Sequence, residues 1–345
     1  MARVSPPAPL LVAPHVADAL SRGTPVVALE STVLTHGLPR PRNLALAHRM
    51  EALVQDQGAV PATVGVIDGR VVVGLAANQL ERLSMGGAEK ASTWNLAALA
   101  AAGADAGTTV ATTLYAAHAA GIEVFATGGI GGVHETAFDE SADLPALARF
   151  PVLTVCAGPK SILDASATLE RLETLGVPVV GYRSDRLAGF VVPTIDLALP
   201  SRVDDPEAAA AVLLAQRALG LPGGVLVSNP VSEGIDSATF ARLLAKARAD
   251  ARRETVRGRD TTPFLLERLA AHSQGRTVDV NLRLLEENAI LAGRIAVALA
   301  RIRSTEPAPA GARQRGAAGN DGAADTTTTG ATGASAPARA VERTA

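Results

Sequence analysis

The sequence is poor in aromatic residues and nearly free of cysteine. Aromatic residues make up 3% of the 345 residues, and Cys156 is the single cysteine. One thiol cannot form an intramolecular disulfide, so we expect the protein to work in a reducing compartment. Cys156 lies within an apolar run and is interpreted as a small core residue. A net charge of −2 with few aromatics also argues against a nucleic-acid binder, which usually carries a basic stripe with interleaved aromatics.

Long hydrophobic runs are missing as well. No apolar stretch approaches the roughly 18 residues that a membrane-spanning helix needs without a charge or a Gly or Pro break. The apolar segment near the N-terminus is short and interrupted by proline, which is not typical of a secretory signal. We therefore expect a protein without membrane contacts, located in the cytoplasm.

Lysine is scarce. Only Lys90, Lys160 and Lys246 are lysines among the 32 basic Lys and Arg residues. Arginine stays protonated, whereas a lysine amine can lose its proton in a desolvated site and add to a carbonyl carbon. Lys160 follows an apolar run in the segment CAGPKS and is the best candidate for such chemistry. Lys246 lies in a polar helical run and is interpreted as a surface residue, while Lys90 is a candidate phosphate or carboxylate contact.

The pattern of apolar residues predicts alternating strands and helices. Buried strands are expected at 25–29, 122–126, 151–156, 177–182 and 224–228, with a hairpin of 63–67 and 70–74 around Asp68-Gly69. Helices are expected at 15–22, 41–57, 77–84, 161–175, 206–219, 237–257, 261–275 and 279–302. Residues 108–114 are interpreted as a strand-like or turn segment leading into a helix at 115–120, and 183–203 as irregular. This alternation favours a three-layer α/β/α sandwich with a mixed, mainly parallel sheet. A TIM barrel is the competing fold, but the pattern lacks eight clean βα units.

Composition divides the chain into three parts. Residues 1–14 are expected to form a loose arm, and 15–303 a single catalytic domain. Residues 304–345 are rich in Ala, Gly and Thr with almost no large apolar side chain. Such a segment cannot bury enough surface to offset its chain entropy, so a disordered tail is expected.

The candidate site residues lie just after predicted strands. Glu30 follows the strand at 25–29, the glycines from Gly128 to Gly132 follow the strand at 122–126, and Lys160 follows the strand at 151–156. Open α/β folds place ligand groups at the carboxyl ends of their parallel strands. With Asp139 and Asp143 in the loop between, these residues indicate a site for a phosphate, a metal ion and a nucleophile. Glu30 could instead pair with an arginine of the following loop.

Eight motifs together resemble one enzyme family. They are ALESTVLTHGLPRPRN at 28–43, GTTVATT at 107–113, ATGGIGGVH at 126–134, FDESADL at 138–144, CAGPKSILD at 156–164, SNP at 228–230, TPFLL at 262–266 and ENAILAGRIA at 287–296. In this order they resemble the pseudouridine-5′-phosphate glycosidases, a family that includes the indigoidine-cluster A protein. The resemblance covers residues 15 to 303. One departure follows Lys90, where the family usually has a Ser and then an Arg-Asp pair, and this chain has Trp94 and Asn95.

The resemblance implies a manganese-dependent α/β/α enzyme that is usually a homotrimer. Its reaction interconverts pseudouridine 5′-phosphate and water with uracil and ribose 5-phosphate. By matching motifs, Glu30 is the proton donor, Lys160 the nucleophile and Asp139 the ligand of one Mn²⁺ ion. The implied substrate contacts are Lys90, Val110, His134, Ser141, Ala142, Asp143 and Asn288.

The chemistry of a carbon–carbon glycosidic bond fits these residue types. Protonation of a leaving nitrogen is impossible in such a bond, but an amine that captures the sugar as an imine and an acid that protonates uracil C5 provide a path. A lone carboxylate suits a hydrated Mn²⁺ or Mg²⁺ that also binds phosphate oxygens. Two other hypotheses stay open: a Schiff-base aldolase or lyase acting on a sugar phosphate, and a sugar-phosphate sensor without catalysis.

Overall fold

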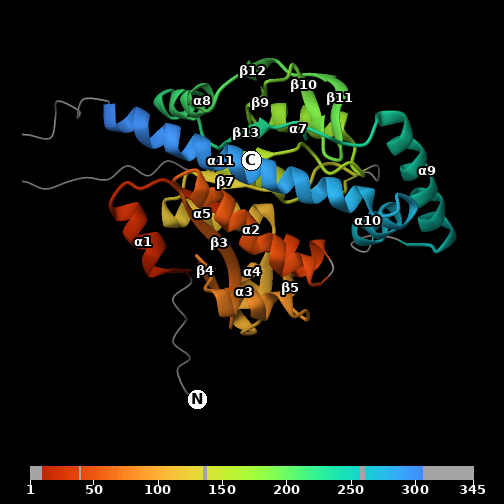
Figure 1. The fold of residues 1–345 in the computed structure, drawn as a ribbon, viewed down its shortest axis with the longest axis horizontal. Helices are drawn as coiled ribbons and strands as arrows, with labels where there is room; N and C mark the ends of the chain where they lie inside the picture. Colours follow the sequence, from red (N-terminus) through yellow and green to blue (C-terminus); the bar gives the residue numbers. More distant parts are fainter. Residues whose placement is uncertain (1–9, 39, 135–137, 257–260, 306–345) are drawn as a thin grey trace, which may run out of the picture. The chain divides into compact units, whose positions relative to one another are not determined.

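The computed structural model describes residues 10–38, 40–134, 138–256 and 261–305. Eleven strands form one mixed sheet in the order β1-β4-β3-β2-β7-β8-β13-β9-β12, with β6 paired to β3 and β5 paired to β6. The pairing is parallel except that β3 is antiparallel to β4 and to β6. Helices lie on both sides of the sheet (Figure 1). The expected three-layer arrangement with a mixed, mainly parallel sheet is confirmed, and the TIM barrel is excluded.

The strands of this sheet are short. They are β1 (Leu10–Val12), β2 (Val26–Leu29), β3 (Val60–Ile67), β4 (Arg70–Val73), β5 (Glu89–Ala91), β6 (Ala106–Thr108), β7 (Val124–Ala126), β8 (Leu153–Cys156), β9 (Val179–Tyr182), β12 (Ser201–Val203) and β13 (Val225–Ser228). A separate antiparallel pair consists of β10 (Arg186–Gly189) and β11 (Val192–Ala198).

The helices fall between these strands. They are α1 (Pro14–Ser21), the π-helical turn η1 (Val33–Gly37), α2 (Arg42–Asp56), α3 (Ala77–Ser84), α4 (Leu96–Ala101), α5 (Val110–Ala120), α6 (Asp143–Arg149), α7 (Ala165–Thr174), α8 (Pro206–Ala218), α9 (Ser237–Arg253), α10 (Thr261–His272) and α11 (Arg276–Thr305). None of the helices seen in these ranges is both long and apolar enough to cross a membrane.

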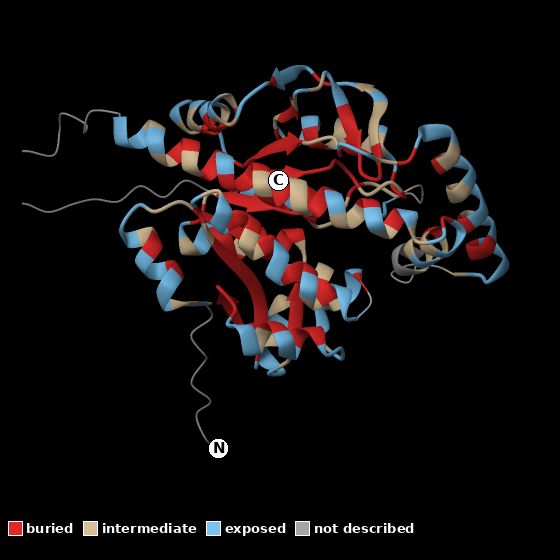
Figure 2. Cartoon of the chain, in the orientation of Figure 1, coloured by how far each residue is buried: buried red, intermediate tan, exposed pale blue. Residues whose placement is uncertain are grey.

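The central strands are apolar on both faces because each face is covered by helices. Successive residues of β2 enter opposite clusters: Val27 and Leu29 pack with α2, α8 and α11, whereas Val26 and Ala28 pack with α1, α5 and α6. Figure 2 shows the resulting band of buried strands through the middle of the fold. A parallel sheet covered on both sides requires such continuous apolar runs.

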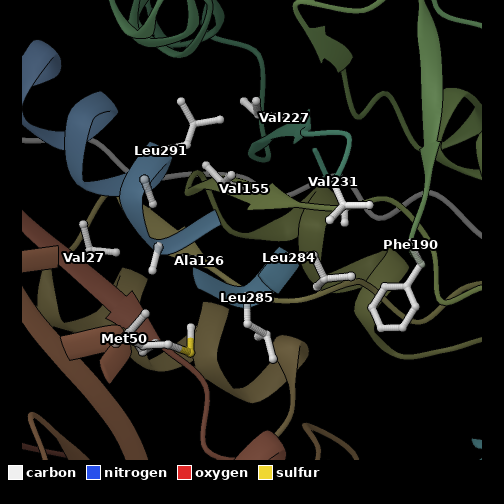
Figure 3. Packing of buried hydrophobic residues seen from close by; sticks show 14 of the residues in the cluster. Val27, Met50, Ala126, Val155, Phe190, Val227, Val231, Leu284, Leu285 and Leu291 are labelled. Carbon is white, nitrogen blue, oxygen red and sulfur yellow. The ribbon is translucent and has the colours of Figure 1, made fainter. Parts of the chain in front are cut away.

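The long helix α11 crosses the sheet between α2 and α8 (Figure 1). Its side chains Leu284, Leu285 and Leu291 pack with residues of the central strands, as Figure 3 shows. Gly128 lies under this helix, and an added Cβ there would approach Leu284 and Leu285 to 3.2 and 3.1 Å. Glycine at this position therefore allows α11 to lie close to the loop that follows β7.

Several expectations about the chain ends and irregular segments were wrong. Leu10–Val12 pair with β4 and so are not part of a loose arm, because their apolar residues extend the sheet edge. Ser304 and Thr305 continue α11 instead of beginning a tail. The expectations for residues 1–9 and 306–345 fall on residues that the structure does not describe.

Residues 183–203 were expected to be irregular but contain three strands, β10 to β12. Their side chains include exposed polar residues such as Arg186, Asp196 and Arg202, so the apolar pattern that marks the central strands is weak here. The segment 108–114 also differs: the strand ends at Thr108 and α5 begins at Val110, with Thr109 as its N-cap. A β-branched run predicted a strand, but the cap and the packing of α5 against the sheet favour the helix.

Candidate active site

The site residues lie at the carboxyl edge of the central parallel strands. In the β2–β7 pair, Leu29 is opposite Ala126, and each strand ends at that point. The next residues, Glu30 and Thr127, are joined by a hydrogen bond that the Thr127 hydroxyl donates to Glu30 Oε1. The sequence places Glu30 here because the buried run before it fixes where the strand ends.

The Glu30 carboxyl has a raised pKa. Burial is the largest cause because it disfavours the charged form, and the nearby Asp143 carboxylate acts in the same direction. Lys160, the Thr127 hydrogen bond and Lys90 oppose this shift. Glu30 is therefore a carboxyl that holds its proton to higher pH than an ordinary glutamate, as a general acid requires.

Lys160 lies on a turn after β8 that is fixed at several points. Its N–H donates to Ile130 O at 3.0 Å, and a parallel bridge joins Ile130 to Pro159, so the β7–β8 pairing continues past the strand ends. The next residue, Ser161, donates its hydroxyl to Gly189 O at 2.9 Å and accepts from Val191 N at 3.3 Å. The β10–β11 hairpin thus supports the turn that carries Lys160.

Lys90 reaches the same cluster from β5. Surrounding protein atoms displace water from the Lys90 amine, and this loss of solvation lowers its pKa; the positive charge of Lys160 acts in the same direction. The residue as a whole is still exposed. Asn95, one of the two residues that depart from the family pattern, accepts from Ser92 N at 2.8 Å and donates to Lys90 O at 3.0 Å. Asn95 therefore closes the turn after Lys90, while Trp94 is exposed.

Asp143 is buried and joins two parts of the site. Its Oδ1 accepts from Ala111 N at 2.9 Å in the first turn of α5, and its Oδ2 accepts from Gly131 N at 2.8 Å in the glycine-rich loop. A Cβ on Gly131 would lie 2.2 Å from the Ser141 hydroxyl, so this loop tolerates no side chain here. The carboxylate holds the α5 N-terminus and the glycine-rich loop in a fixed relation.

The structure brings most of the other predicted residues toward this edge. Val110 is buried at the start of α5. The Ser141 hydroxyl accepts from Asp143 N at 3.2 Å, and Ala142 precedes α6. Asn288 is fully buried on α11, where its amide nitrogen donates to Thr127 O at 2.8 Å.

His134 and Asp139 lie farther out in the same loop. The His134 N–H donates to Asp139 O at 2.9 Å, and Asp139 is exposed. Within the described ranges, no three His, Cys, Asp or Glu side chains form a group suited to a metal ion. Both oxygens of the nearby Asp143 accept backbone hydrogen bonds. The described donor set would therefore fit only an ion that keeps most of its water.

Three polar residues of the site were missed from the sequence. Thr127 contacts Glu30, Asn229 donates to Asn288 Oδ1 at 2.9 Å, and Thr108 donates to Val64 O at 2.8 Å while bonding Ser31. Thr127 and Asn229 are each the first residue after a central strand. That position, which singled out Glu30, is the signal that could have identified them.

Cys156 is expected to be unreactive in the folded protein. Burial raises the pKa of its thiol to about 12, so almost no thiolate forms near pH 8. Titration with a disulfide reagent should show less than about a tenth of one thiol reacting natively within an hour, and one full equivalent after denaturation. Rapid labelling of the native protein would mean that the strand end opens to solvent.

Comparisons with known proteins identify the family. Residues 15–298 match the family described as indigoidine synthase A like protein. The chain is 58% identical over 276 residues to a pseudouridine-5′-phosphate glycosidase of Thermus thermophilus, covering 80% of this chain and 98% of that protein. It is 53% identical over 293 residues to a protein of the same name from Salinispora tropica, covering 83% and 90% of the two chains.

Two solved structures are similar to this chain in both fold and sequence. The prealnumycin C-glycosynthase AlnA, crystallised with ribulose 5-phosphate, superposes with a TM-score of 0.81 at 38% identity and covers 87% of this chain and 100% of its own. An indigoidine synthase A-like protein from Thermotoga maritima gives 0.78 at 36% identity, covering 85% and 97%. With this match along almost all of the described domain, the chain belongs to the indigoidine synthase A-like family.

Proposed function

We propose that this protein is a pseudouridine-5′-phosphate glycosidase, an enzyme that cleaves the carbon–carbon glycosidic bond of pseudouridine 5′-phosphate with water to give uracil and ribose 5-phosphate. The observation that carries the proposal is the presence of a half-buried glutamic acid of raised pKa and a lysine at one strand edge: Glu30 and Lys160 interact electrostatically there. The curated relatives that carry this name support the substrate.

Lys160 is the proposed nucleophile. Its amine forms a bond from Nζ to C1′ of the ribose as the C1′–O4′ bond opens, and a proton passes from the new ammonium to O4′, which becomes a hydroxyl. The nitrogen lone pair then expels uracil and leaves an imine between Lys160 and the open sugar. Water hydrolyses the imine, which releases ribose 5-phosphate and restores the amine.

Glu30 is the proposed acid for the leaving group. Cleavage of the C1′–C5 bond leaves negative charge on uracil, and a proton delivered to C5 makes uracil a neutral product. A carboxyl whose pKa is raised by burial and by the Asp143 charge is suited to supply this proton. In the reverse direction, the carboxylate takes the same proton from uracil C5.

The remaining residues are proposed to hold the substrate. Lys90, near Lys160 and partly exposed, suits the phosphate or a ribose oxygen. The Val110 backbone at the start of α5 suits an anionic group. His134, Ser141, Ala142, Asp143 and Asn288 complete the proposed contacts, with Asp143 and Asn288 acting at least in part by fixing backbone groups.

We propose Asp139 as the protein ligand of one Mn²⁺ ion, which when bound supplies positive charge for the substrate phosphate. Asp139→Asn is expected to raise the Mn²⁺ concentration for half-maximal activity at least tenfold, with little change in melting temperature because the side chain is exposed. Asp56→Asn, at the far end of α2, is the matched control. An unchanged Mn²⁺ activation curve would place the metal elsewhere.

Incubation of the purified protein with pseudouridine 5′-phosphate tests the proposed reaction directly. Chromatography should detect uracil and ribose 5-phosphate in equal amounts. A Schiff-base aldolase would instead split a sugar phosphate and release no uracil, and a sensor would bind without turnover. The cytoplasmic location stays a prediction from the sequence, and the homotrimer stays an expectation from the family resemblance.

A further inference from the structure

Thr127 is fixed in the site by every polar group that it has. Its N–H donates to Val155 O at 3.0 Å, its carbonyl accepts from the Asn288 amide at 2.8 Å, and its hydroxyl donates to Glu30 Oε1. The residue is fully buried. The backbone of Thr127 is thus held by β8 and α11, and its hydroxyl hydrogen is directed at Glu30.

The Asn288 amide is itself held in place. Its oxygen accepts from Asn229 Nδ2 at 2.9 Å, and its nitrogen also lies 3.4 Å from Gly128 O. Hydrogen bonds thus link β13, α11, β7 and β2 in one line that ends at Glu30. Because four separate elements contribute, this line fixes the carboxyl relative to the whole strand edge.

The hydrogen bond also decides which oxygen of Glu30 carries the proton. A hydroxyl that donates to Oε1 makes that oxygen an acceptor, so the transferable proton is on Oε2. The charged groups that face the carboxyl are Lys160 and Lys90, which favour its ionised form, and Asp143, which favours the protonated form. Burial is the larger influence, and the Thr127 hydroxyl moderates it.

We propose that Thr127 is a positioning residue for the reaction, which acts through Glu30 by holding the carboxyl with Oε2 toward the substrate and is itself held by Asn288 and Asn229. This inference rests on the proposed function, since it assigns Thr127 a part in the same proton transfer. Thr127 does not need to touch the substrate for this role.

The test compares three substitutions at Thr127 with a matched control. Thr127→Val keeps the shape and removes the hydroxyl, Thr127→Ala removes it with less volume, and Thr127→Ser keeps it. The control is Thr154→Val in β8, which makes the same change at a buried hydroxyl that has no hydrogen-bond partner among the described residues. For each protein, kcat and KM for uracil release from pseudouridine 5′-phosphate are measured across pH.

Removal of the hydroxyl should lower kcat at least tenfold at pH 7 and change KM by less than threefold. It should also move the alkaline limb of the kcat profile. The hydrogen bond lowers the pKa of Glu30, so its loss raises that pKa, and the acid then stays protonated to higher pH. Thr127→Ser should retain kcat within about threefold, and Thr154→Val should match wild type in both readouts.

Three results distinguish a failure of the proposed function from a failure of the positioning role of Thr127. Wild-type protein that releases no uracil would overturn the proposed function itself. Active wild type with an unmoved alkaline limb and unchanged kcat in Thr127→Val would overturn the positioning role alone. An equal loss in Thr127→Ser and Thr127→Val would also overturn it, because it would mean that packing and not the hydroxyl matters. If the valine protein does not fold, Thr127→Ala has the same expected result.

Discussion

Replacing Lys160 with arginine is expected to lower kcat more than a hundredfold while the fold persists. Arginine keeps the positive charge and most of the length of lysine, but its guanidinium stays protonated and cannot form an imine. Removal of a covalent nucleophile normally costs several orders of magnitude in rate. Lys160 has few alternatives in this chain because the chemistry needs an amine and only three lysines exist.

Lys246→Arg is the matched control, since Lys246 is exposed on α9. Its kcat should equal that of wild type, and both variants should give the wild-type circular dichroism spectrum. Activity of Lys160→Arg above about a hundredth of wild type would remove Lys160 from the nucleophile role. Lys90, whose pKa is lowered, would then be the next amine to test by the same substitution.

Replacing Glu30 with glutamine should separate binding from chemistry. Glutamine keeps the shape and an oxygen that can accept the Thr127 hydrogen bond, but it has no transferable proton. We expect kcat for uracil release to fall at least a hundredfold with KM changed only a few-fold, the range typical of a lost general acid. The alkaline limb that Glu30 gives to the wild-type profile should disappear. That limb lies above the ordinary range of a glutamate because burial raises the Glu30 pKa.

A change in KM without a fall in kcat would contradict the role of Glu30 as the acid. If Glu30→Gln raises KM with little change in kcat, the carboxyl only helps to bind the ribose, since loss of uniform binding has that signature. Lys160 would keep its role in either case. Ribose 5-phosphate alone should still form an imine in Glu30→Gln, because that step requires no proton transfer to uracil.

The central part of the fold could be predicted from the sequence. The strands β2, β7, β8 and β13 are runs that must be apolar on both faces, and the turn signal Asp68-Gly69 correctly predicted the β3–β4 hairpin. These features depend on local composition alone. The ends of these strands could be placed within a few residues, and Glu30 and Lys160 could therefore be predicted to lie just beyond them.

The remaining strands depend on contacts between distant residues, which the local pattern of apolar and polar residues does not reveal. The β10–β11 hairpin has exposed polar residues on its strands, and it is positioned partly by Ser161 and by Phe190 N, which donates to Ala157 O at 2.8 Å. The strand β5 is three residues long and is recognised only through its pairing with β6. Such pairings bring together residues far apart in the sequence.

In the site, too, some residues could be predicted from the sequence and others could not. A rare lysine and a carboxylate after a buried strand indicated chemistry, but a small hydroxyl such as Thr127 carries no comparable signal. Its part becomes evident only when β2 and β7 are in register and α11 places Asn288 over the loop. Asp143 is similar, because its two backbone partners come from segments 12 and 32 residues away.

Trapping of the imine is the most direct measurement of the central claim. Wild-type protein is mixed with ribose 5-phosphate and sodium borohydride, digested, and mapped by mass spectrometry. Reduction of the imine to a stable amine should place one sugar-phosphate adduct on the peptide that contains Lys160, and Lys160→Arg should show none. An adduct confined to Lys90 or Lys246, or no adduct at all from an enzyme that releases uracil, would contradict the lysine mechanism.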